Sequence, residues 1–164
     1  MSRAFEIECR RAEVDSAVAL ALISQLNSEL EAAYPEEGAN HFRLDRAETR
    51  PGTGAFLIAY NGADALGCAA LRRLPTAPQP FAPAGEVKRM YVRNAYRRHG
   101  VAASLLQALE REAALLGICH LLLETGTRQV AAVRFYERAG FATIPCFGEY
   151  ADAPLSLCMA KSLQ

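Results

Sequence analysis

A strand-like segment, a basic turn and an amphipathic helix follow one another in the middle of the chain. "EVKRMYV" (86–92) has the length and composition of a strand, and "NAYRRHG" (94–100) leads into apolar residues with helical spacing. A helix begins with unpaired N–H groups and a partial positive charge, so basic side chains there are favourable when an anion lies between them. The unit therefore predicts a β–turn–α element that binds a phosphate-like anion.

The helix that starts in this unit has a continuous apolar face. Its apolar residues recur at spacings of three and four, Leu106 widens the stripe, and Gly117 marks the predicted end. Gln107, Glu110 and Arg111 lie on the opposite side. We expect the helix to cover a sheet with the stripe Val101, Leu105, Leu109, Ala113 and Leu116.

The segments before the unit alternate between strand and helix patterns. "FEIEC" (5–9) predicts a strand, and a helix follows from a cap at Asp15 or Ser16 to about Ala33. A loop or short helix reaches Arg50. "AFLIAY" and "ALGCAALRRL" then flank Asn61-Gly62 and predict a β-hairpin. Four prolines within "PTAPQPFAP" predict a stiff connection.

After the unit, "HLLLET" (120–125) is a continuous apolar run, typical of a strand covered on both faces. A helix over 129–139 and strands near 142–147 and 155–160 follow. The order β, α, (α), β-hairpin, β, α, β, α, β, β predicts a mixed α/β sheet with helices on both faces. With 164 residues and no repeat or linker, the chain is expected to be one domain, 1–164.

Composition limits the partners and the location of the protein. Hydrophobic residues make up 51% and charged residues 22%, the balance of an ordinary globular domain, and the net charge is zero. We therefore expect neither a nucleic acid nor a membrane as partner. The five cysteines form no C-x-x-C pair, and no signal segment or span-length apolar run is visible. This indicates core thiols in a cytoplasmic protein that needs no metal.

The turn at Gly100 could hold a diphosphate. Glycine leaves the backbone open to close approach, and Ala102 keeps the first helical turn small. A solvated basic turn is the alternative. The chain has neither G-x-G-x-x-G at a strand end nor G-x-x-x-x-G-K-[ST], which disfavours nicotinamide and nucleoside triphosphate sites.

"VKRMYVRNAYRRHGVAASLLQALE" followed by "LLLETGTRQVAAVRFYERAGF" resembles the cofactor-binding core of the GNAT superfamily of acyl-CoA-dependent N-acetyltransferases, over about residues 86–141. The resemblance implies a central, mostly antiparallel sheet of six to seven strands with a splayed parallel pair in the middle. It also implies that R-x-x-G-x-A, from Arg97 to Ala102, wraps the pyrophosphate of acetyl-CoA. The strand before it would be bulged and would bind pantetheine through the backbone of Met90 and Val92.

The same resemblance gives the set of cofactor-binding residues. Arg98 stands where many members have glycine, and Gln129 where many have asparagine. The expected set is Met90, Tyr91, Val92, Arg97, Arg98, His99, Gly100, Val101, Ala102, Ala103, Gln129 and Tyr136.

Tyr136 and two glutamates are the candidate catalytic residues. A lysine-like amine is neutral only about once in a few thousand molecules at pH 7, so a base or a desolvating pocket is required. By resemblance, Tyr136 in "AAVRFYERAGF" protonates the leaving thiolate, and Glu86 or Glu124 is the base. A backbone N–H near Met90 would meet the oxyanion. The alternatives are packing for Tyr136 and pairing with a neighbouring arginine for Glu86.

Several other residues have two interpretations. His41, Glu36 and Glu37 line the acceptor site if the resemblance extends that far, or else a solvated loop. Tyr150 either reaches the acceptor pocket or packs between the last strands. The adjacent Cys119 and His120 point to opposite faces of a strand, which disfavours a nucleophilic pair.

We therefore expect an acetyl-CoA-dependent N-acetyltransferase that forms a ternary complex with a primary amine, on a small molecule or a peptide. The alternatives are a non-catalytic acyl-CoA-binding regulatory module and a phosphate binder of other chemistry. Pairing through the last strands is common in the resembled family, so a homodimer is one expected assembly. The sequence does not identify the acceptor.

Overall fold

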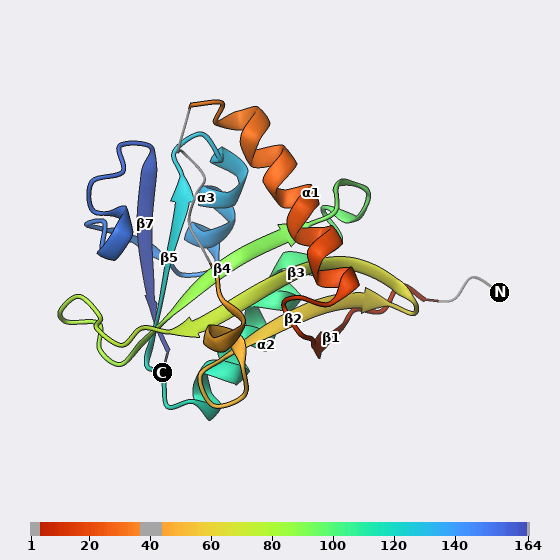
Figure 1. Ribbon diagram of the computed structural model, residues 1–164, viewed down its shortest axis with the longest axis horizontal. Coiled ribbons are helices and arrows are strands. Elements are labelled where there is room, and N and C mark those ends of the chain that lie inside the picture. Colours follow the sequence, from red (N-terminus) through yellow and green to blue (C-terminus); the bar gives the residue numbers. More distant parts are fainter. Residues whose placement is uncertain (1–3, 37–43, 164) are drawn as a thin grey trace.

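A seven-stranded sheet with the order β1-β2-β3-β4-β5-β7-β6 forms the centre of the protein (Figure 1). The computed structural model describes residues 4–36 and 44–163. Neighbouring strands are antiparallel except β4 and β5, which are parallel, and this confirms the predicted fold class. The strands are β1 (Glu8–Arg11), β2 (Gly54–Asn61), β3 (Asp64–Arg73), β4 (Ala84–Val92), β5 (His120–Gly126), β6 (Ala142–Ile144) and β7 (Ser156–Ser162).

Helices cover both faces of the sheet, as the sequence predicted. The helix α1 (Ala17–Ala33) lies on one face, in front in Figure 1, and α2 (Val101–Leu115) and α3 (Val130–Arg138) lie on the other. Residues of β2 alternate between these layers, because Phe56 packs with the α1 cluster and Leu57 with the α2 cluster. Three short 3₁₀ turns complete the fold: η1 (Arg46–Thr49), η2 (Asn94–Tyr96) and η3 (Gly148–Tyr150).

Local signals placed several element boundaries correctly, whereas the strand expected near 142–147 is shorter, since β6 ends at Ile144. Ser16 caps α1, since its Oγ accepts a hydrogen bond from the Ala19 N–H at 3.3 Å. Asn61 pairs with Asp64 across the predicted hairpin turn. The predicted face of α2 is confirmed as well, since Val101, Leu105, Leu109 and Ala113 are all buried.

The first strand begins later than predicted. β1 covers Glu8–Arg11 rather than 5–9, because its partners on β2 run only from Leu57 to Tyr60. Arg11 at its end binds Glu112 of α2 through two hydrogen bonds of 2.8 and 2.9 Å. The alternating pattern identified a strand, but the position of β2 decides which residues pair.

β4 is bulged and separates from β5, as the family resemblance implied. β4 pairs with β5 only between Ala84 and Val87. Farther along, Lys88 pairs with Ala70 of β3 and Tyr91 with Cys68, so that two residues of β4 lie opposite one of β3. Arg89 in the bulge has a left-handed φ of 55°. The second half of β4 therefore diverges from β5, which continues alongside β7 to Gly126.

The five cysteines differ in burial, and only some of them are core residues. Cys68 and Cys158 are buried, but Cys119 is exposed, which corrects the prediction for that thiol. All five are free. In the part of the chain that the structure describes, no helix has both the length and the apolar character needed to cross a membrane.

Candidate active site

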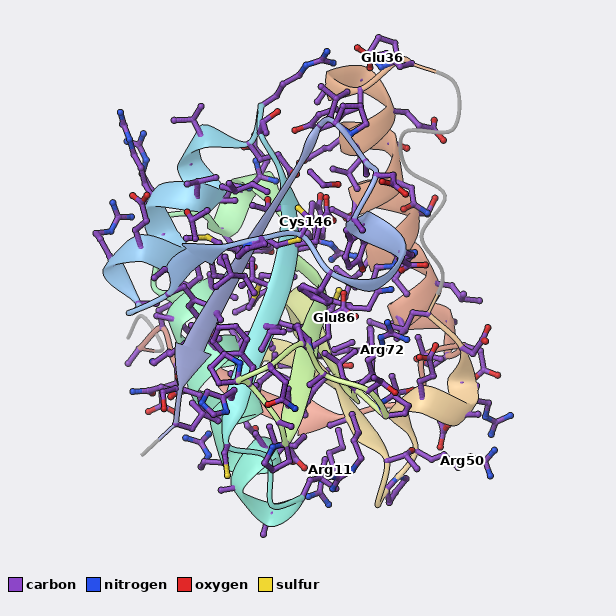
Figure 2. The ribbon with its side chains drawn as sticks, turned by 90° about the vertical axis from the view of Figure 1, so that its left-hand side faces the viewer. Arg11, Glu36, Arg50, Arg72, Glu86 and Cys146 are labelled. Atoms are coloured by element: carbon purple, nitrogen blue, oxygen red, sulfur yellow. The ribbon has the colours of Figure 1, made fainter. Side chains whose placement is uncertain are left out.

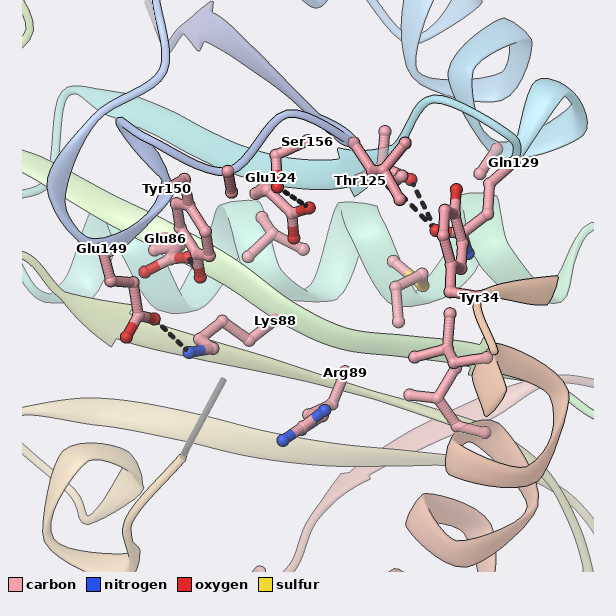
Figure 3. Close-up of a pocket in the computed structure, with 18 of the residues that line it drawn as sticks. Tyr34, Glu86, Lys88, Arg89, Glu124, Thr125, Gln129, Glu149, Tyr150 and Ser156 are labelled. Carbon is pink, nitrogen blue, oxygen red and sulfur yellow. Dashed lines mark hydrogen bonds and ion pairs between the residues drawn. The ribbon is translucent and has the colours of Figure 1, made fainter. Parts of the chain in front are cut away.

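A cavity of about 550 Å³ lies where β4 and β5 separate (Figure 3). Its walls come from the end of α1, the bulged part of β4, the end of β5, the start of α3 and the segment from η3 to β7. Seven of the candidate residues named from the sequence line it: Glu36, Glu86, Met90, Glu124, Gln129, Tyr136 and Tyr150. The cavity therefore brings together all three candidate catalytic residues.

Glu86 is held on both carboxylate oxygens. Its Oε1 accepts a hydrogen bond from Arg72 Nε at 2.8 Å, and its Oε2 accepts one from the Tyr150 hydroxyl at 2.5 Å. Arg72 and Glu86 lie close together in Figure 2, and Arg72 also pairs with Glu48 of η1 at 2.5 Å. Glu86 is 1% exposed. The pairing with an arginine is thus observed, although the partner comes from β3 and not from the neighbouring basic cluster.

Glu124 has a different environment at the end of β5. One of its carboxylate oxygens accepts a hydrogen bond from Ser156 Oγ at 2.8 Å. Burial raises the pKa of Glu124 above its usual value, the nearby Glu86 carboxylate adds to that increase, and the Ser156 hydrogen bond opposes it. A half-buried carboxylate with a raised pKa in a cavity is suited to accept a proton near neutral pH.

Tyr136 lies in α3 with its ring buried against Phe135 and Phe141. It is 6% exposed and still lines the cavity. Desolvation raises the pKa of its phenol well above the usual value, so the hydroxyl keeps its proton at neutral pH. Tyr136 therefore both packs in the core, as the alternative interpretation held, and contributes to the cavity wall.

Contacts between the end of α1 and the loop before α3 join two walls of the cavity. The Tyr34 hydroxyl accepts a hydrogen bond from the backbone N–H of Arg128 at 2.8 Å, and the Arg128 guanidinium pairs with Glu36 at 2.5 Å. Gln129 Oε1 accepts from the Gly126 N–H at 2.9 Å. The Gln129 side chain thus orders the loop after β5 by accepting a hydrogen bond from the backbone of that loop. Of the predicted acceptor-site residues in this region, His41 and Glu37 lie outside the described residues.

The turn before α2 has the backbone that the phosphate interpretation requires. Gly100 is the N-cap residue of α2, with φ at 79°, and Arg98 also has a left-handed φ, of 67°. A Cβ at Gly100 would meet nothing within 4 Å, so the space in front of this turn is open. Because Arg98 adopts a conformation that favours glycine, the structure explains why glycine suits this position.

Three of the predicted cofactor residues use their side chains elsewhere. Arg97 donates to the Val92 carbonyl at 2.9 Å and pairs with Glu29 of α1 at 2.7 Å. The His99 ring packs on the ring of Phe5 at 5.1 Å between centroids. The Tyr91 ring is buried in the α1 cluster. These three residues do not line the cavity, so the turn and the cavity are separate regions of the structure.

The start of α2 offers mainly its backbone to a ligand. Val101 is 2% exposed and belongs to the core beneath α2, so its side chain does not face the turn. Ala102 is half-buried and Ala103 is exposed. Small residues here leave room in front of the first N–H groups of the helix, as predicted.

Several residues of the cavity wall were not predicted from the sequence, among them two cationic residues, an acidic residue and a tyrosine. Lys88, Arg89, Glu149 and Tyr34 all line it. Lys88 follows Glu86 by two positions in a strand, so a period-2 reading could have placed it on the same face. Arg89 and Tyr34 gave no such signal, because a bulge and a helix end position them.

Comparison with known proteins identifies the family. The profile of the acetyltransferase (GNAT) family matches residues 19–141. An IAA acetyltransferase of Azospirillum brasilense is 37% identical over 142 residues, which are 87% of this chain and 88% of that protein.

Solved structures agree with this relationship. A Klebsiella pneumoniae protein assigned to the acyl-CoA N-acyltransferases superposes with a TM-score of 0.79 and 29% identity, over 98% of this chain and 100% of its own. A GNAT acetyltransferase of Elizabethkingia anophelis, solved with acetyl-CoA bound, has the same fold, with a TM-score of 0.62 and 15% identity over 96% of this chain and 98% of its own. The chain therefore belongs to the acetyltransferase (GNAT) family and is an acyltransferase.

Proposed function

We propose that the protein transfers an acetyl group from acetyl-CoA to a primary amine by direct attack in a ternary complex. The observation that carries this proposal is the separation of β4 from β5 beyond Val87, between the turn at Gly100 and the cavity that contains Glu124 and Tyr136. An extended cosubstrate bound along β4 would have its phosphates at one end of this gap and its thioester at the other.

The turn at Gly100 supports the choice of cosubstrate. It combines an open space, a helix N-terminus and a left-handed backbone, which suit a diphosphate. The Elizabethkingia anophelis protein with the same fold binds acetyl-CoA. Because Arg97 is paired with Glu29, we assign the main phosphate contacts to backbone N–H groups and expect the arginines to contribute by charge.

The bulged part of β4 is the proposed track for pantetheine. Met90 lines the cavity, and β4 is paired with β3 on its other edge. Its backbone is therefore the natural partner for an extended amide chain. The carbonyl of Val92 already accepts a hydrogen bond from Arg97, so we place more weight on Met90 than on Val92.

Glu124 is the proposed base. Glu86 has both oxygens engaged by Arg72 and Tyr150, whereas Glu124 shows a single hydrogen bond to Ser156 and a raised pKa. In the reaction, the amine nitrogen bonds to the thioester carbonyl carbon, and its proton passes to Glu124 directly or through water. We assign Glu86 the task of holding the Tyr150 hydroxyl, as a positioning residue.

Tyr136 is the proposed acid. When the C–S bond breaks, the electron pair remains on sulfur, and the Tyr136 hydroxyl donates its proton to that thiolate. This proton transfer replaces one buried anion, the thiolate, by another, the phenolate. Burial of the site therefore does not by itself oppose the transfer. A backbone N–H near Met90 would stabilise the oxyanion that forms before the bond breaks.

Release of free thiol from acetyl-CoA in the presence of an amine panel tests the proposal. We expect thiol release that depends on the amine and a higher melting temperature with coenzyme A, since a ligand of the native state stabilises it. Stabilisation by coenzyme A without thiol release on a broad panel would favour the regulatory module. No stabilisation would favour a phosphate binder. Cytoplasmic location and pairing into a homodimer stay predictions.

A further inference from the structure

The thiol of Cys68 contacts the backbone of the bulge in β4. Cys68 lies on β3, and its Sγ donates a hydrogen bond to the carbonyl oxygen of Arg89 at 3.3 Å. Arg89 is the bulge residue with the left-handed backbone. Cys68 is 0% exposed and packs in the cluster beneath α1. The contact therefore joins a buried side chain of β3 to the stretch of β4 that leaves the regular ladder.

The Cys68 thiol is a hydrogen-bond donor at neutral pH. Burial raises its pKa to about 12, and the positive charges of Arg89 and Arg93 oppose that increase only partly. The thiol therefore keeps its proton. An S–H group is a weak donor, but a bulge disrupts the ladder locally, so that a side-chain donor can hold a carbonyl in an orientation that the ladder does not fix.

Gly67, the neighbour of Cys68 on β3, also fits the shape of the bulged strand. A Cβ at Gly67 would lie 2.3 Å from the carbonyl oxygen of Tyr91 and 3.1 Å from the Cα of Val92. Only a residue without a side chain lets β3 approach β4 this closely. Two consecutive residues of β3 therefore follow the backbone of the bulged segment, one by a hydrogen bond and one by close approach.

The Cys68 contact fixes the direction of the peptide group between Arg89 and Met90. In a trans peptide such as this one, the C=O and N–H groups point in opposite directions. Because the Arg89 carbonyl points toward Cys68 on β3, the Met90 N–H points away from β3. The other edge of β4 is the one from which β5 has separated beyond Val87, as Figure 1 shows, and Met90 lines the cavity there.

We propose that Cys68 is a positioning residue: its thiol holds the Arg89 carbonyl toward β3 and thereby orients the Met90 N–H toward the thioester carbonyl of bound acetyl-CoA. This inference rests on the proposed function and adds a residue to it. The N–H stabilises the oxyanion that forms when the amine attacks. Cys68 does not line the cavity, so its effect on the reaction passes through the backbone of β4.

Replacement of Cys68 by serine and by alanine separates hydrogen bonding from packing. The two side chains have nearly the same size, but only serine keeps a donor. A lost oxyanion donor lowers kcat about 100- to 1,000-fold, and a misdirected one accounts for part of that. We therefore expect thiol-release assays to show a kcat about tenfold lower or more in Cys68→Ala, and within about threefold of the wild type in Cys68→Ser. The KM for acetyl-CoA should change little, because the oxyanion forms only after the amine attacks.

Stability separates this role from a merely structural one. Cys68→Ser places a hydroxyl in an apolar cluster, so its melting temperature should be no higher than that of Cys68→Ala, although its kcat is higher. Ile58→Val is the matched control for packing. Ile58 lies opposite Cys68 on β2, is 1% exposed and packs in the same cluster, while β3 separates it from β4. This variant should lose about 2–4 °C in melting temperature and keep the wild-type kcat.

Three results would overturn the inference and leave the proposed function intact. They are a wild-type kcat in Cys68→Ala, a loss of kcat in Cys68→Ser as large as that in Cys68→Ala, and an equal loss in Ile58→Val. If the melting curve shows that Cys68→Ala is unfolded, Cys68→Val, which also lacks a donor, takes its place with the same expected loss. If the wild type releases no thiol with any amine, the proposed function itself fails, and the inference with it.

Discussion

Replacing Gly100 by alanine would separate cosubstrate binding from stability. An alanine Cβ at this position meets nothing within 4 Å in the protein, so no steric clash arises within the native fold. The left-handed φ of 79° costs an alanine about 1–2 kcal/mol, and the smaller entropy of its unfolded chain offsets about 0.4–1 kcal/mol. We therefore expect a net loss of about 1 kcal/mol, or about 2–4 °C in melting temperature for a chain of this size.

The same methyl group would occupy the space that we assign to the diphosphate. Loss of one charge-assisted backbone contact is worth about 1.5–3 kcal/mol, so the KM for acetyl-CoA should rise about 10- to 100-fold. The effect is measured by thiol-release kinetics with acetyl-CoA as the varied substrate. The melting temperature of the free protein is measured in parallel.

Gly117 offers a matched control at the other end of the same helix. Its φ is 70°, and a Cβ there also meets nothing within 4 Å. Gly117→Ala should therefore lose a similar amount of stability but keep the wild-type KM. If Gly100→Ala also kept the wild-type KM for acetyl-CoA, the diphosphate would not lie at this turn, and the reasoning about the cosubstrate would be refuted.

Three further predictions concern the cavity. Tyr136→Phe should lower kcat about 100-fold or more with little change in melting temperature, and unchanged turnover in steady-state assays would exclude the acid role. Glu124→Gln should lower kcat/KM and remove the acidic limb of the pH profile of kcat/KM. Because the pKa of Glu124 is raised, that limb should lie at a higher pH than is usual for a glutamate. An acidic limb that survives in the variant would belong to another group. The raised pKa also means that Glu124 stabilises the fold below its unfolded-state pKa, a contribution lost as the pH rises through its folded-state pKa, so pH-dependent unfolding should be flatter in the variant. Arg72→Met leaves the 1% exposed Glu86 without its cation and should cost about 3–5 kcal/mol in chemical denaturation; a loss below 1 kcal/mol would show that Tyr150 alone suffices.

The sequence by itself determined the local elements and the turn that we propose binds the cosubstrate. The stripe on α2, the cap at Ser16 and the hairpin at Asn61 are short-range patterns, in which neighbouring residues select their own backbone conformation. The turn at Gly100 is local in the same sense. Its pattern therefore indicated a phosphate-like ligand before any tertiary contact was known.

The proposed acceptor side depended on contacts between residues far apart in the sequence. Glu86 meets Arg72 from the neighbouring strand and Tyr150 from η3, and these contacts distinguish it from Glu124, which the sequence could not do. The Tyr34 hydroxyl meets the backbone of Arg128, 94 residues away. Such pairs follow from strand register and helix position, which a periodic pattern does not specify.

The bulge in β4 separates what the sequence predicted from what only the tertiary structure decided. Residues 86–92 were recognised as a strand, and the family resemblance implied a bulge, but only the pairing with β3 places the extra residue at Arg89. That one shift turns Lys88 and Arg89 toward the same cavity. Side-chain periodicity determines which residues can share a face, whereas the register between strands decides which of them do.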